Sequence, residues 1–352
     1  MPRKTAEFQE INMRKTATIA LAAMYAIGMI LTSCQESRYI KTSGEIQGTF
    51  YNITYKSSEN LDSLILTELN KFNKSLSIFD AESTISRINN NEDVNPEADT
   101  VFMKVFNRAM EVSRETDGAF DITVSPIVKL WGFNHATPQE VTQAKIDSVM
   151  AFVGYDKIRI ENGKAIKADP RVQLDANAIA QGYSCDIIAE FLEKHDVENY
   201  MIEIGGEVRA KGVNGKGDYW RIGIIKPMDD STATNEELQD IMWLDNKSVG
   251  TSGNYHKYRI VDGKKIGHEI DPKTGRTAEN ELLSASIIAD DCISADAYAT
   301  ACMVMGLQKS LELCRKNGKI EGYFIYLDKD GKERMACTEG FRKRLNTQNQ
   351  NN

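Results

Sequence analysis

The chain has 352 residues, of which 41% are hydrophobic and 27% carry a charged side chain. This composition is that of a globular protein and excludes an intrinsically disordered chain. The formal net charge of −8 argues against nucleic acid as a partner, because a protein that binds phosphate backbones needs a basic surface. A phosphorylated small molecule can still be held through a metal ion and main-chain amides.

The N-terminus has the pattern of an export signal. Arg14 and Lys15 precede an apolar run over 17–31, which is shorter than a membrane-spanning helix and ends in Leu-Thr-Ser-Cys. This resembles a bacterial lipoprotein signal, so we expect 1–33 to be a cleaved signal peptide and Cys34 to be the lipidated first residue. Met13 is a more conventional start of translation than Met1, in which case residues 1–12 would lie upstream of the true start. The alternative is an uncleaved anchor; either way the protein is attached to a bacterial membrane and faces the periplasm.

Periodicity and turn residues predict the elements of the first half of the chain. After a tether over 34–44, they indicate a strand over 45–55, a helix over 61–76, a short helix within 77–89 and a helix over 99–116. The segment over 118–133 is rich in glycine, proline and aromatic residues, and we expect it to be irregular. Thr137 and Pro138 have the N-cap and N1 pattern of a helix that runs to about residue 150.

The second half alternates in the manner of antiparallel strands. A hairpin is predicted to turn at Asn162 and Gly163. A strand over 172–175 then runs into a helix over 178–195, and such a junction leaves amides for phosphate and carbonyls for ions. Further strands are predicted over 200–204, 219–225, 241–249, 255–261, 264–270, 321–327 and 332–337, with a polar tail over 341–352. The predicted fold class is therefore α+β. P-loop and Rossmann fingerprints are absent.

The most informative stretch lies over 284–306, where a strand leads into a helix with Ser294 as its predicted N-cap. Asp296 and Thr300 are four residues apart, so both oxygens project from one helix face. A hard cation such as Mg²⁺ suits them, because it binds one or two carboxylates and fills its other positions with water, carbonyls and phosphate. On these two residues alone, the alternative is an acidic residue near the helix N-terminus and a threonine bonded to the preceding turn.

Eight segments resemble, in order, those of the ApbE family of FAD:protein FMN transferases. They are GTFYNITY, SIFDAESTISRIN, TDGAFDITVSPI, LDANAIAQGY, IEIGGEVRAKG, VGTSGNYHKY, GHEIDPKTG and ADAYATACMVMG. Each segment alone is weak evidence for the family, but all eight in this order over about 45–340 are specific for it. The resemblance implies one flavin transferase domain over these residues, a bilobed α+β body with antiparallel sheet regions and FAD in the cleft between the lobes.

The resemblance also implies the reaction and the partners. FAD is the substrate and Mg²⁺ the cofactor; FMN is joined through its phosphate to a threonine or serine of an exported acceptor protein, and AMP leaves. Electron-transport subunits are the acceptors that the family implies. Two alternatives stay open, namely a Mg²⁺-dependent FAD pyrophosphatase and a non-catalytic flavin-binding lipoprotein, because water and threonine are both hydroxyl nucleophiles.

The site residues that the resemblance implies are carried over by segment. The metal ligands are Asp296, Thr300 and the main-chain carbonyl of Ala178. The FAD contacts are Gln47, Phe79, Ala119, Phe120, Asp121, Asp175, Gln181, Thr251, Ser252 and Ile270. His268 is expected to assist deprotonation of the acceptor hydroxyl, with a purely structural histidine as the alternative, and Asp271 to orient its imidazole or help the metal.

Two positions depart from the family pattern. Gln181 stands where the family usually has lysine, which removes a positive charge from beside the pyrophosphate. Gln47 stands where methionine is common, so a contact at the flavin edge is expected to differ. Neither change removes a metal ligand, so slower transfer or compensation by another cation is expected rather than loss of function.

Overall fold

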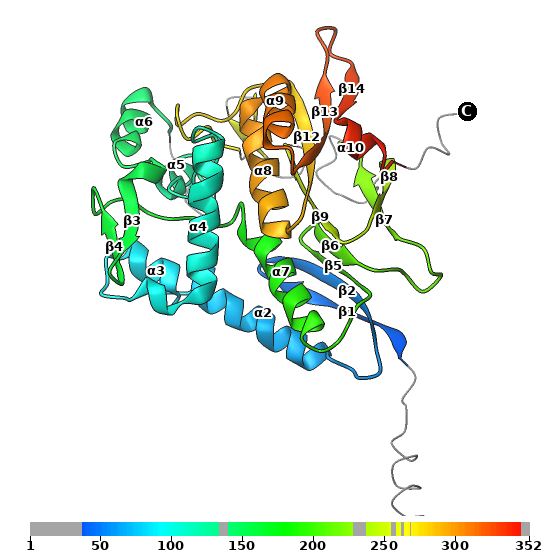
Figure 1. Cartoon of the computed structure of the whole chain (residues 1–352). Helices are drawn as coiled ribbons and strands as arrows, with labels where there is room; N and C mark the ends of the chain where they lie inside the picture. Colours follow the sequence, from blue (N-terminus) through cyan, green and yellow to red (C-terminus); the bar gives the residue numbers. More distant parts are fainter. Residues whose placement is uncertain are drawn as a thin grey trace, which may run out of the picture. The chain divides into compact units, whose positions relative to one another are not determined.

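The structure is a computed structural model that describes residues 37–133, 140–227, 237–254, 258–261, 264–267 and 269–345 (Figure 1). The chain divides into two units, 1–38 with 57–59, and 39–56 with 60–352. In the first unit, the hydroxyl of Ser57 accepts a hydrogen bond from the amide of Glu59 at 3.0 Å. The second unit carries the candidate site.

The helices of the described chain come in groups between runs of strands. They are α2 (Asp62–Leu76), α3 (Thr84–Asn89), η1 (Pro96–Ala98), α4 (Thr100–Glu115), α5 (Ser125–Leu130), α6 (Gln143–Met150), η2 (Tyr155–Lys157), α7 (Ala180–Glu193), α8 (Cys292–Met305), α9 (Leu307–Asn317) and α10 (Glu339–Arg342). Among the described residues, no helix is both long and apolar enough to cross a membrane.

Among the described residues, eight strands form the central sheet in the order β1-β2-β5-β6-β9-β12-β13-β14. Their bounds are β1 (Arg38–Ile46), β2 (Thr49–Ser57), β5 (Tyr200–Ile204), β6 (Glu207–Lys211), β9 (Lys247–Gly253), β12 (Leu282–Ala289), β13 (Glu321–Leu327) and β14 (Glu333–Cys337). Three two-stranded sheets pair β3 (Ile158–Glu161) with β4 (Lys164–Lys167), β7 (Trp220–Ile225) with β8 (Leu238–Leu244), and β10 (Tyr258–Val261) with β11 (Lys264–Gly267). Mixed helices and antiparallel strands confirm the predicted α+β class.

Helices α7 and α8 pack on one face of the central sheet, and α2 and α4 pack against these two helices (Figure 1). The alternation of side chains along β12 explains why both faces of the sheet are covered. Ala285 and Ile287 lie in the core beneath α8, whereas Ile288 lies in a separate core with Trp220 and Phe341 on the other face. The helix α8 therefore lies inside the molecule, between α4 and strands β9 and β12.

Several elements agree with the sequence-based expectations because local signals specify them. Helix α2 differs from the predicted 61–76 by one residue, and the side chain of Asp99 caps α4 by accepting from the amide of Phe102 at 3.0 Å. The β3–β4 hairpin turns at Asn162 and Gly163, which both have positive φ, as a two-residue hairpin turn requires. Strand β5 has the predicted bounds.

The expected single strand over 45–55, preceded by a tether, is wrong. Strand β1 begins at Arg38, and the chain reverses at Gln47 and Gly48, whose φ angles are 55° and 72°. Glycine adopts positive φ at little cost and glutamine rarely adopts it. The turn therefore gives only a weak signal in the sequence.

The strand predicted over 172–175 does not form, because its backbone groups have other partners. The side chain of Asn89 accepts from the amide of Leu174 at 2.6 Å and donates to its carbonyl at 2.9 Å. The amide of Asp175 donates to the carbonyl of Ile122 at 2.7 Å. These bonds join the segment to α3 and to the loop at Ile122 instead of to a neighbouring strand.

The strand predicted over 241–249 is two strands, because β8 ends at Leu244 and β9 begins at Lys247. Asn246 has a φ of 46°, and a polar residue that tolerates positive φ suits this turn. Residues 250–253, which we expected between strands, belong to β9 in the middle of the sheet.

The remaining differences concern short or terminal elements. Helix α5 lies in the segment expected to be irregular, and α9 was not predicted. The predicted start at Thr137 and Pro138 lies outside the described residues, but α6 begins only at Gln143, after the capping residue Thr142. The expected polar tail contributes Phe341 and Leu345 to a core.

Candidate active site

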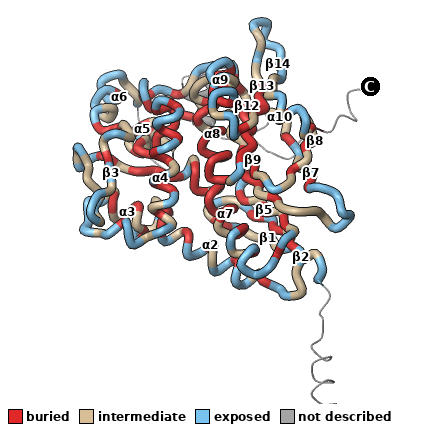
Figure 2. The backbone as a smooth tube through the Cα atoms, viewed as in Figure 1, coloured by how far each residue is buried: buried red, intermediate tan, exposed pale blue. Residues whose placement is uncertain are grey.

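Helix α8 is buried along most of its length, and its first turn differs from the prediction (Figure 2). Its N-cap is Asp291, whose side chain accepts from the amide of Ser294 at 3.1 Å. Ser294 therefore lies within the helix, where its hydroxyl accepts from Arg108 at 2.9 Å. Because the helix starts earlier than expected, Asp296 lies in its second turn and 6% of it is exposed.

Helices α7 and α8 touch through their backbones at Gly182. The amide of Gly182 donates to Oδ2 of Asp296 at 2.9 Å. A Cβ atom at Gly182 would lie 2.3 Å from the carbonyl oxygen of Cys292 and 2.7 Å from Cβ of Asp296. Only glycine fits at this crossing, and its amide fixes one oxygen of the buried carboxylate.

The carbonyl of Ala178 lies beside this contact. In an α-helix the amide of residue i+4 bonds to the carbonyl of residue i, so the amide of Gly182 would bond to Ala178. Here that amide donates to Asp296, whereas the amide of Tyr183 bonds to the carbonyl of Ile179 at 3.2 Å. Within the part of the chain that the structure describes, the carbonyl of Ala178 receives no main-chain hydrogen bond. It is therefore available to a ligand near the Asp296 carboxylate.

Strand β9 approaches the same turns of α8 from the sheet. A Cβ atom at Gly250 would lie 2.6 Å from the amide nitrogen of Asp296, and the hydroxyl of Ser252 lies 3.2 Å from that of Thr300. Successive residues of a strand point to opposite faces. Accordingly, the hydroxyl of Thr251 lies on the other face, 2.8 Å from Ser286. The structure brings Ser252 to the predicted metal ligands but not the side chain of Thr251.

The predicted contacts over 119–121 have structural roles in this chain. Ala119 and Phe120 are buried. One oxygen of Asp121 accepts from the amide and the hydroxyl of Thr123, both at 2.7 Å, and the other accepts from the amide of Tyr155 at 2.6 Å. Burial raises the pKa of Asp121 although these hydrogen bonds favour its charged form. The carboxylate fixes the loop, which leaves main-chain atoms as the groups it could offer to a ligand.

Asp175 connects this loop to the α7 junction. Its amide donates to the carbonyl of Ile122 at 2.7 Å, and its side chain accepts from the amide of Asn177 at 2.9 Å. The loop over 119–123 and the turn that contains Ala178 are therefore adjacent. The sequence places these segments more than fifty residues apart.

Two glutamines lie near the turn between β5 and β6. A Cβ atom at Gly205 would lie 2.8 Å from Nε2 of Gln181, and the amide of Gly205 donates to the carbonyl of Phe50 at 3.0 Å, close to the β1–β2 turn. Both amide atoms of the Gln47 side chain are buried, and neither has a hydrogen-bonding partner among the described residues. An unsatisfied buried amide is costly, so a ligand that bonds to it would remove that cost.

The structure shows local roles for three of the other predicted residues, and two lie outside the described residues. Ile270 packs in a core with Ile127 and Leu130. Asp271 accepts from the amide of Lys273 at 2.9 Å and so caps a turn. Phe79 is 63% exposed. His268 and Cys34 lie outside the described residues.

Two residues of the site were missed by the sequence analysis, Asp186 and Arg209. Asp186 on α7 accepts from the amides of Cys292 and Ile293 at 2.9 and 2.8 Å, and Arg209 donates to it at 2.6 Å. Burial raises the pKa of Asp186 to about 6, against the attraction of Arg209. The spacing of Gly182 and Asp186, four apart on one helix face, was the signal available in the sequence.

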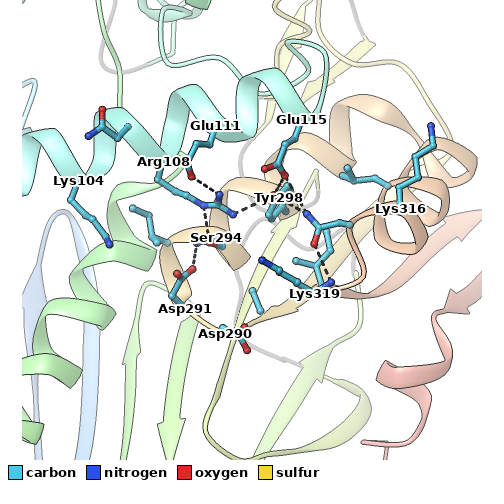
Figure 3. A pocket seen from close by; sticks show the side chains of 16 residues that line it. Lys104, Arg108, Glu111, Glu115, Asp290, Asp291, Ser294, Tyr298, Lys316 and Lys319 are labelled. Carbon is cyan, nitrogen blue, oxygen red and sulfur yellow. Dashed lines mark hydrogen bonds and ion pairs between the residues drawn. The ribbon is translucent and has the colours of Figure 1, made fainter. Parts of the chain in front are cut away.

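A polar pocket of about 830 Å³ lies on another face of α8, between α4 and the end of α9 (Figure 3). Arg108 donates to the hydroxyl of Tyr298 at 3.3 Å, and that hydroxyl donates to Glu115. The pocket is lined by four cationic residues and four carboxylates, which leaves no net charge to attract a pyrophosphate. Residues 294 and 298 point away from the face that carries Asp296 and Thr300, so this pocket is separate from the predicted metal ligands.

The donor set at the α7–α8 contact is a carboxylate, a main-chain carbonyl and a hydroxyl. Such oxygens suit a hard divalent cation. The described residues contain no cluster of three or more histidine, cysteine, aspartate or glutamate side chains that could hold a metal. A site with one carboxylate and neutral oxygens does not require such a cluster. A carboxylate has about four lone-pair positions, so the bond from Gly182 and a cation can coexist on Asp296.

Comparisons with known proteins agree on one family. The sequence model of the ApbE family matches residues 47–324. The FAD:protein FMN transferase of Haemophilus influenzae is 36% identical over 308 residues, which cover 83% of this chain and 88% of that protein. The FAD:protein FMN transferase of Vibrio cholerae is 34% identical over 330 residues, covering 91% of this chain and 96% of that protein.

Solved structures give the same result. The flavin transferase ApbE from Vibrio cholerae has a TM-score of 0.78 and 32% identity, covering 88% of this chain and all of that one. The apo form of the flavinyl transferase ApbE from Pseudomonas stutzeri has a TM-score of 0.77 and 28% identity, covering 89% of this chain and 99% of that one.

Proposed function

The chain belongs to the ApbE family, and we propose that it transfers FMN from FAD to a hydroxyl group of an acceptor protein, with Mg²⁺ held at the α7–α8 contact. Relatives that match this chain over most of their length are named FAD:protein FMN transferase. The chain is therefore a transferase that uses FAD as its substrate. The Mg²⁺ site, the release of AMP and the roles of individual residues rest on the geometry described above and on the resemblance in sequence.

The observation that carries the metal assignment is the hydrogen bond from Gly182 to Asp296. It fixes a buried carboxylate beside the carbonyl of Ala178, and it leaves that carbonyl without a main-chain donor. Thr300, one turn further along α8, adds a hydroxyl that Ser252 contacts at 3.2 Å. These three oxygens would hold Mg²⁺. When bound, the ion supplies neutralisation of the charge that develops on the transferring phosphate.

The reaction itself is a displacement at the phosphorus of the FMN half of FAD. The oxygen of the acceptor hydroxyl forms a bond to that phosphorus, and the bond from phosphorus to the oxygen bridging to AMP breaks. The hydroxyl proton passes to a base, for which His268 and Asp271 stay the predicted pair. AMP leaves with the bridging oxygen and its negative charge. The protein contributes mainly position and electrostatic stabilisation, because phosphoryl transfer needs little covalent help.

Residues around the metal ligands would bind and orient FAD. The buried side-chain amide of Gln47 has no partner among the described residues and suits a polar atom of the ligand. Gln181 lies at the start of α7, where main-chain amides favour a phosphate, but it brings no charge of its own. The main chain around Ala119 to Asp121 lies next to the Ala178 turn through the bond between Asp175 and Ile122. The inter-lobe cleft for FAD stays a prediction.

The membrane attachment forms a separate part of the proposal. The lipobox ending in Cys34 and the apolar run before it support a lipid anchor, with the enzyme facing the periplasm. Acceptors would then be exported proteins or the exposed parts of electron-transport subunits, modified on a serine or threonine.

The test is a transfer assay with FAD, Mg²⁺ and a candidate acceptor domain, in which flavin that stays bound after denaturation is measured by fluorescence. Asp296→Asn should abolish Mg²⁺-dependent transfer, because a neutral amide binds a hard cation far less well than a carboxylate. Thr300→Ala should reduce it less, since water can replace a hydroxyl ligand. The matched controls are Asp245→Asn, in the β8–β9 turn, and Thr67→Ala, on the exposed face of α2.

The same assay separates the alternatives. Release of FMN and AMP without labelled acceptor would indicate a pyrophosphatase, and FAD binding without turnover would indicate a binding protein. Transfer by Asp296→Asn at the wild-type rate, with the same dependence on Mg²⁺, would refute the metal assignment.

A further inference from the structure

The first turn of α8 is held by a carboxylate from another helix. A helix begins with four amides that have no partner within it. The side chain of Asp186, on α7, accepts from the amide of Cys292 at 2.9 Å through Oδ1 and from the amide of Ile293 at 2.8 Å through Oδ2. Asp291 caps the next amide, that of Ser294, at 3.1 Å. Asp291 is local to the helix, whereas Asp186 lies more than a hundred residues earlier in the chain.

Asp186 is itself fixed from the sheet. Arg209, on β6, donates to Oδ1 at 2.6 Å, and only 6% of the Asp186 side chain is exposed. The carboxylate attracts the guanidinium, so the pKa of Arg209 is raised although burial alone would lower it. One carboxylate therefore connects α7, the start of α8 and β6. A buried ion pair of this kind contributes little net stability compared with apolar packing, which points to a role in fixing geometry.

The same face of α7 also contacts the predicted metal ligand. Gly182 and Asp186 are four residues apart and so lie on one side of the helix. The amide of Gly182 donates to Asp296 at 2.9 Å, and Asp186 holds the amides of Cys292 and Ile293, one turn earlier on α8. The two contacts determine where α8 lies along α7. They thereby set the distance between the Asp296 carboxylate and the Ala178 carbonyl.

We propose that Asp186 is a positioning residue for FMN transfer: held by Arg209, it fixes the start of α8 so that Asp296 and the carbonyl of Ala178 bind one divalent cation together. This inference rests on the proposed function, because it assumes that Asp296 is a metal ligand. Without Asp186, the amides of Cys292 and Ile293 lose their acceptor and α8 is free to shift along α7. The ligands would then remain present but be held less accurately.

The experiment measures binding of Mn²⁺, a probe for Mg²⁺ that takes the same oxygen ligands and is visible by electron paramagnetic resonance. The full-length protein is loaded with FAD, and Mn²⁺ affinity is determined for wild type, Asp186→Asn, Arg209→Gln and Asp296→Asn. Asp245→Asn, which removes an aspartate from its pair with Arg344 at 2.5 Å, is the matched control for loss of an ion pair. The Mg²⁺ concentration for half-maximal transfer and kcat are measured on the same samples.

Asp186→Asn should weaken Mn²⁺ binding about tenfold, as is typical when a residue that orients metal ligands is lost. The half-saturating Mg²⁺ concentration should rise by a similar factor, with a smaller change in kcat at saturation. Arg209→Gln leaves both amide bonds of Asp186 in place, so its effect should have the same direction and be smaller. Asp245→Asn should leave Mn²⁺ affinity unchanged.

A folded Asp186→Asn variant with wild-type Mn²⁺ affinity and Mg²⁺ dependence would overturn the inference and leave Asp186 as a helix cap. If that variant does not fold, the test rests on Arg209→Gln. Unchanged Mn²⁺ affinity in Arg209→Gln would overturn the proposal, and weakened Mn²⁺ affinity would support it. Asp296→Asn distinguishes failure of the proposed metal site from failure of the proposed role of Asp186. Wild-type Mn²⁺ affinity in Asp296→Asn would refute both the metal site and the role of Asp186. Loss of Mn²⁺ binding in Asp296→Asn, with unchanged Mn²⁺ affinity in Asp186→Asn, would refute only the role of Asp186.

Discussion

Replacing Gly182 with alanine tests the contact between α7 and α8 directly. The added methyl carbon would lie 2.3 Å from the carbonyl oxygen of Cys292, whereas ordinary contacts begin near 3.4 Å. The helices must therefore separate by about 1 Å. The hydrogen bond from Gly182 to Asp296, now 2.9 Å, would lengthen to about 4 Å and be lost.

The expected loss of stability follows from these two effects. Overpacking costs about 1–3 kcal/mol, and loss of a hydrogen bond to a carboxylate costs about 1.5–3 kcal/mol. The higher helix propensity of alanine offsets at most about 1 kcal/mol. The free energy of unfolding should therefore fall by about 1.5–5 kcal/mol, and the Mg²⁺ concentration needed for transfer should rise.

The assay is urea unfolding followed by circular dichroism, combined with Mg²⁺ titration of the transfer rate. Gly215→Ala is the matched control, because that glycine is exposed and its Cβ would contact Tyr39 at 3.4 Å, an ordinary distance. A Gly182→Ala variant within about 0.5 kcal/mol of wild type, the range of neutral surface changes, and with unchanged Mg²⁺ dependence, would show that the two helices do not touch there.

Three further predictions concern charge and attachment. Gln181→Lys should raise or preserve kcat, since a cation at about 4 Å from the pyrophosphate contributes a few kcal/mol in a partly buried site; a large loss of turnover in a folded variant would contradict this. Cys34→Ser should move the protein from the membrane to the soluble fraction, and a variant that stays in the membrane with its apolar segment intact would refute the lipobox. Asp186 is buried beside Arg209 and Asp291, and its pKa of about 6 lies above its value in the unfolded chain. The folded state therefore holds a proton that the unfolded chain has lost between about pH 4 and 6, so the free energy of unfolding should fall by up to about 3 kcal/mol as pH rises through this window. Urea unfolding at several pH values should show this slope in wild type and not in Asp186→Asn.

Local patterns predicted much of the fold. Helices α2 and α4 have apolar residues at helical spacing, and α4 also has a capping side chain, that of Asp99, at its start; the bounds of both helices agree to within about one residue with the expectation. The turn at Asn162 and Gly163 also has a strong local signal in the sequence, because a two-residue hairpin turn needs positive φ at both positions and asparagine and glycine adopt it readily.

The candidate site was predicted only in part, because its geometry depends on distant partners. Asp296 and Thr300 share a face by helix periodicity alone. The cap at Asp291 was missed because Ser294 has an equally good capping side chain, and only the bond from Arg108 shows that its hydroxyl has another partner. Asp186 looked like an ordinary helix residue, since the amides it holds belong to a helix that follows much later.

The contact between Gly182 and Asp296 joins positions 114 residues apart. Closing such a loop has an entropic cost that the intervening strands of the sheet must offset first, so the ligand oxygens meet only after most of the domain has folded. A cation cannot gather them in the unfolded chain. Binding of FAD, and of Mg²⁺ at the proposed site, would therefore act on the folded state alone and stabilise the whole domain by mass action, by about 2.7 kcal/mol when a ligand is present at a hundred times its Kd.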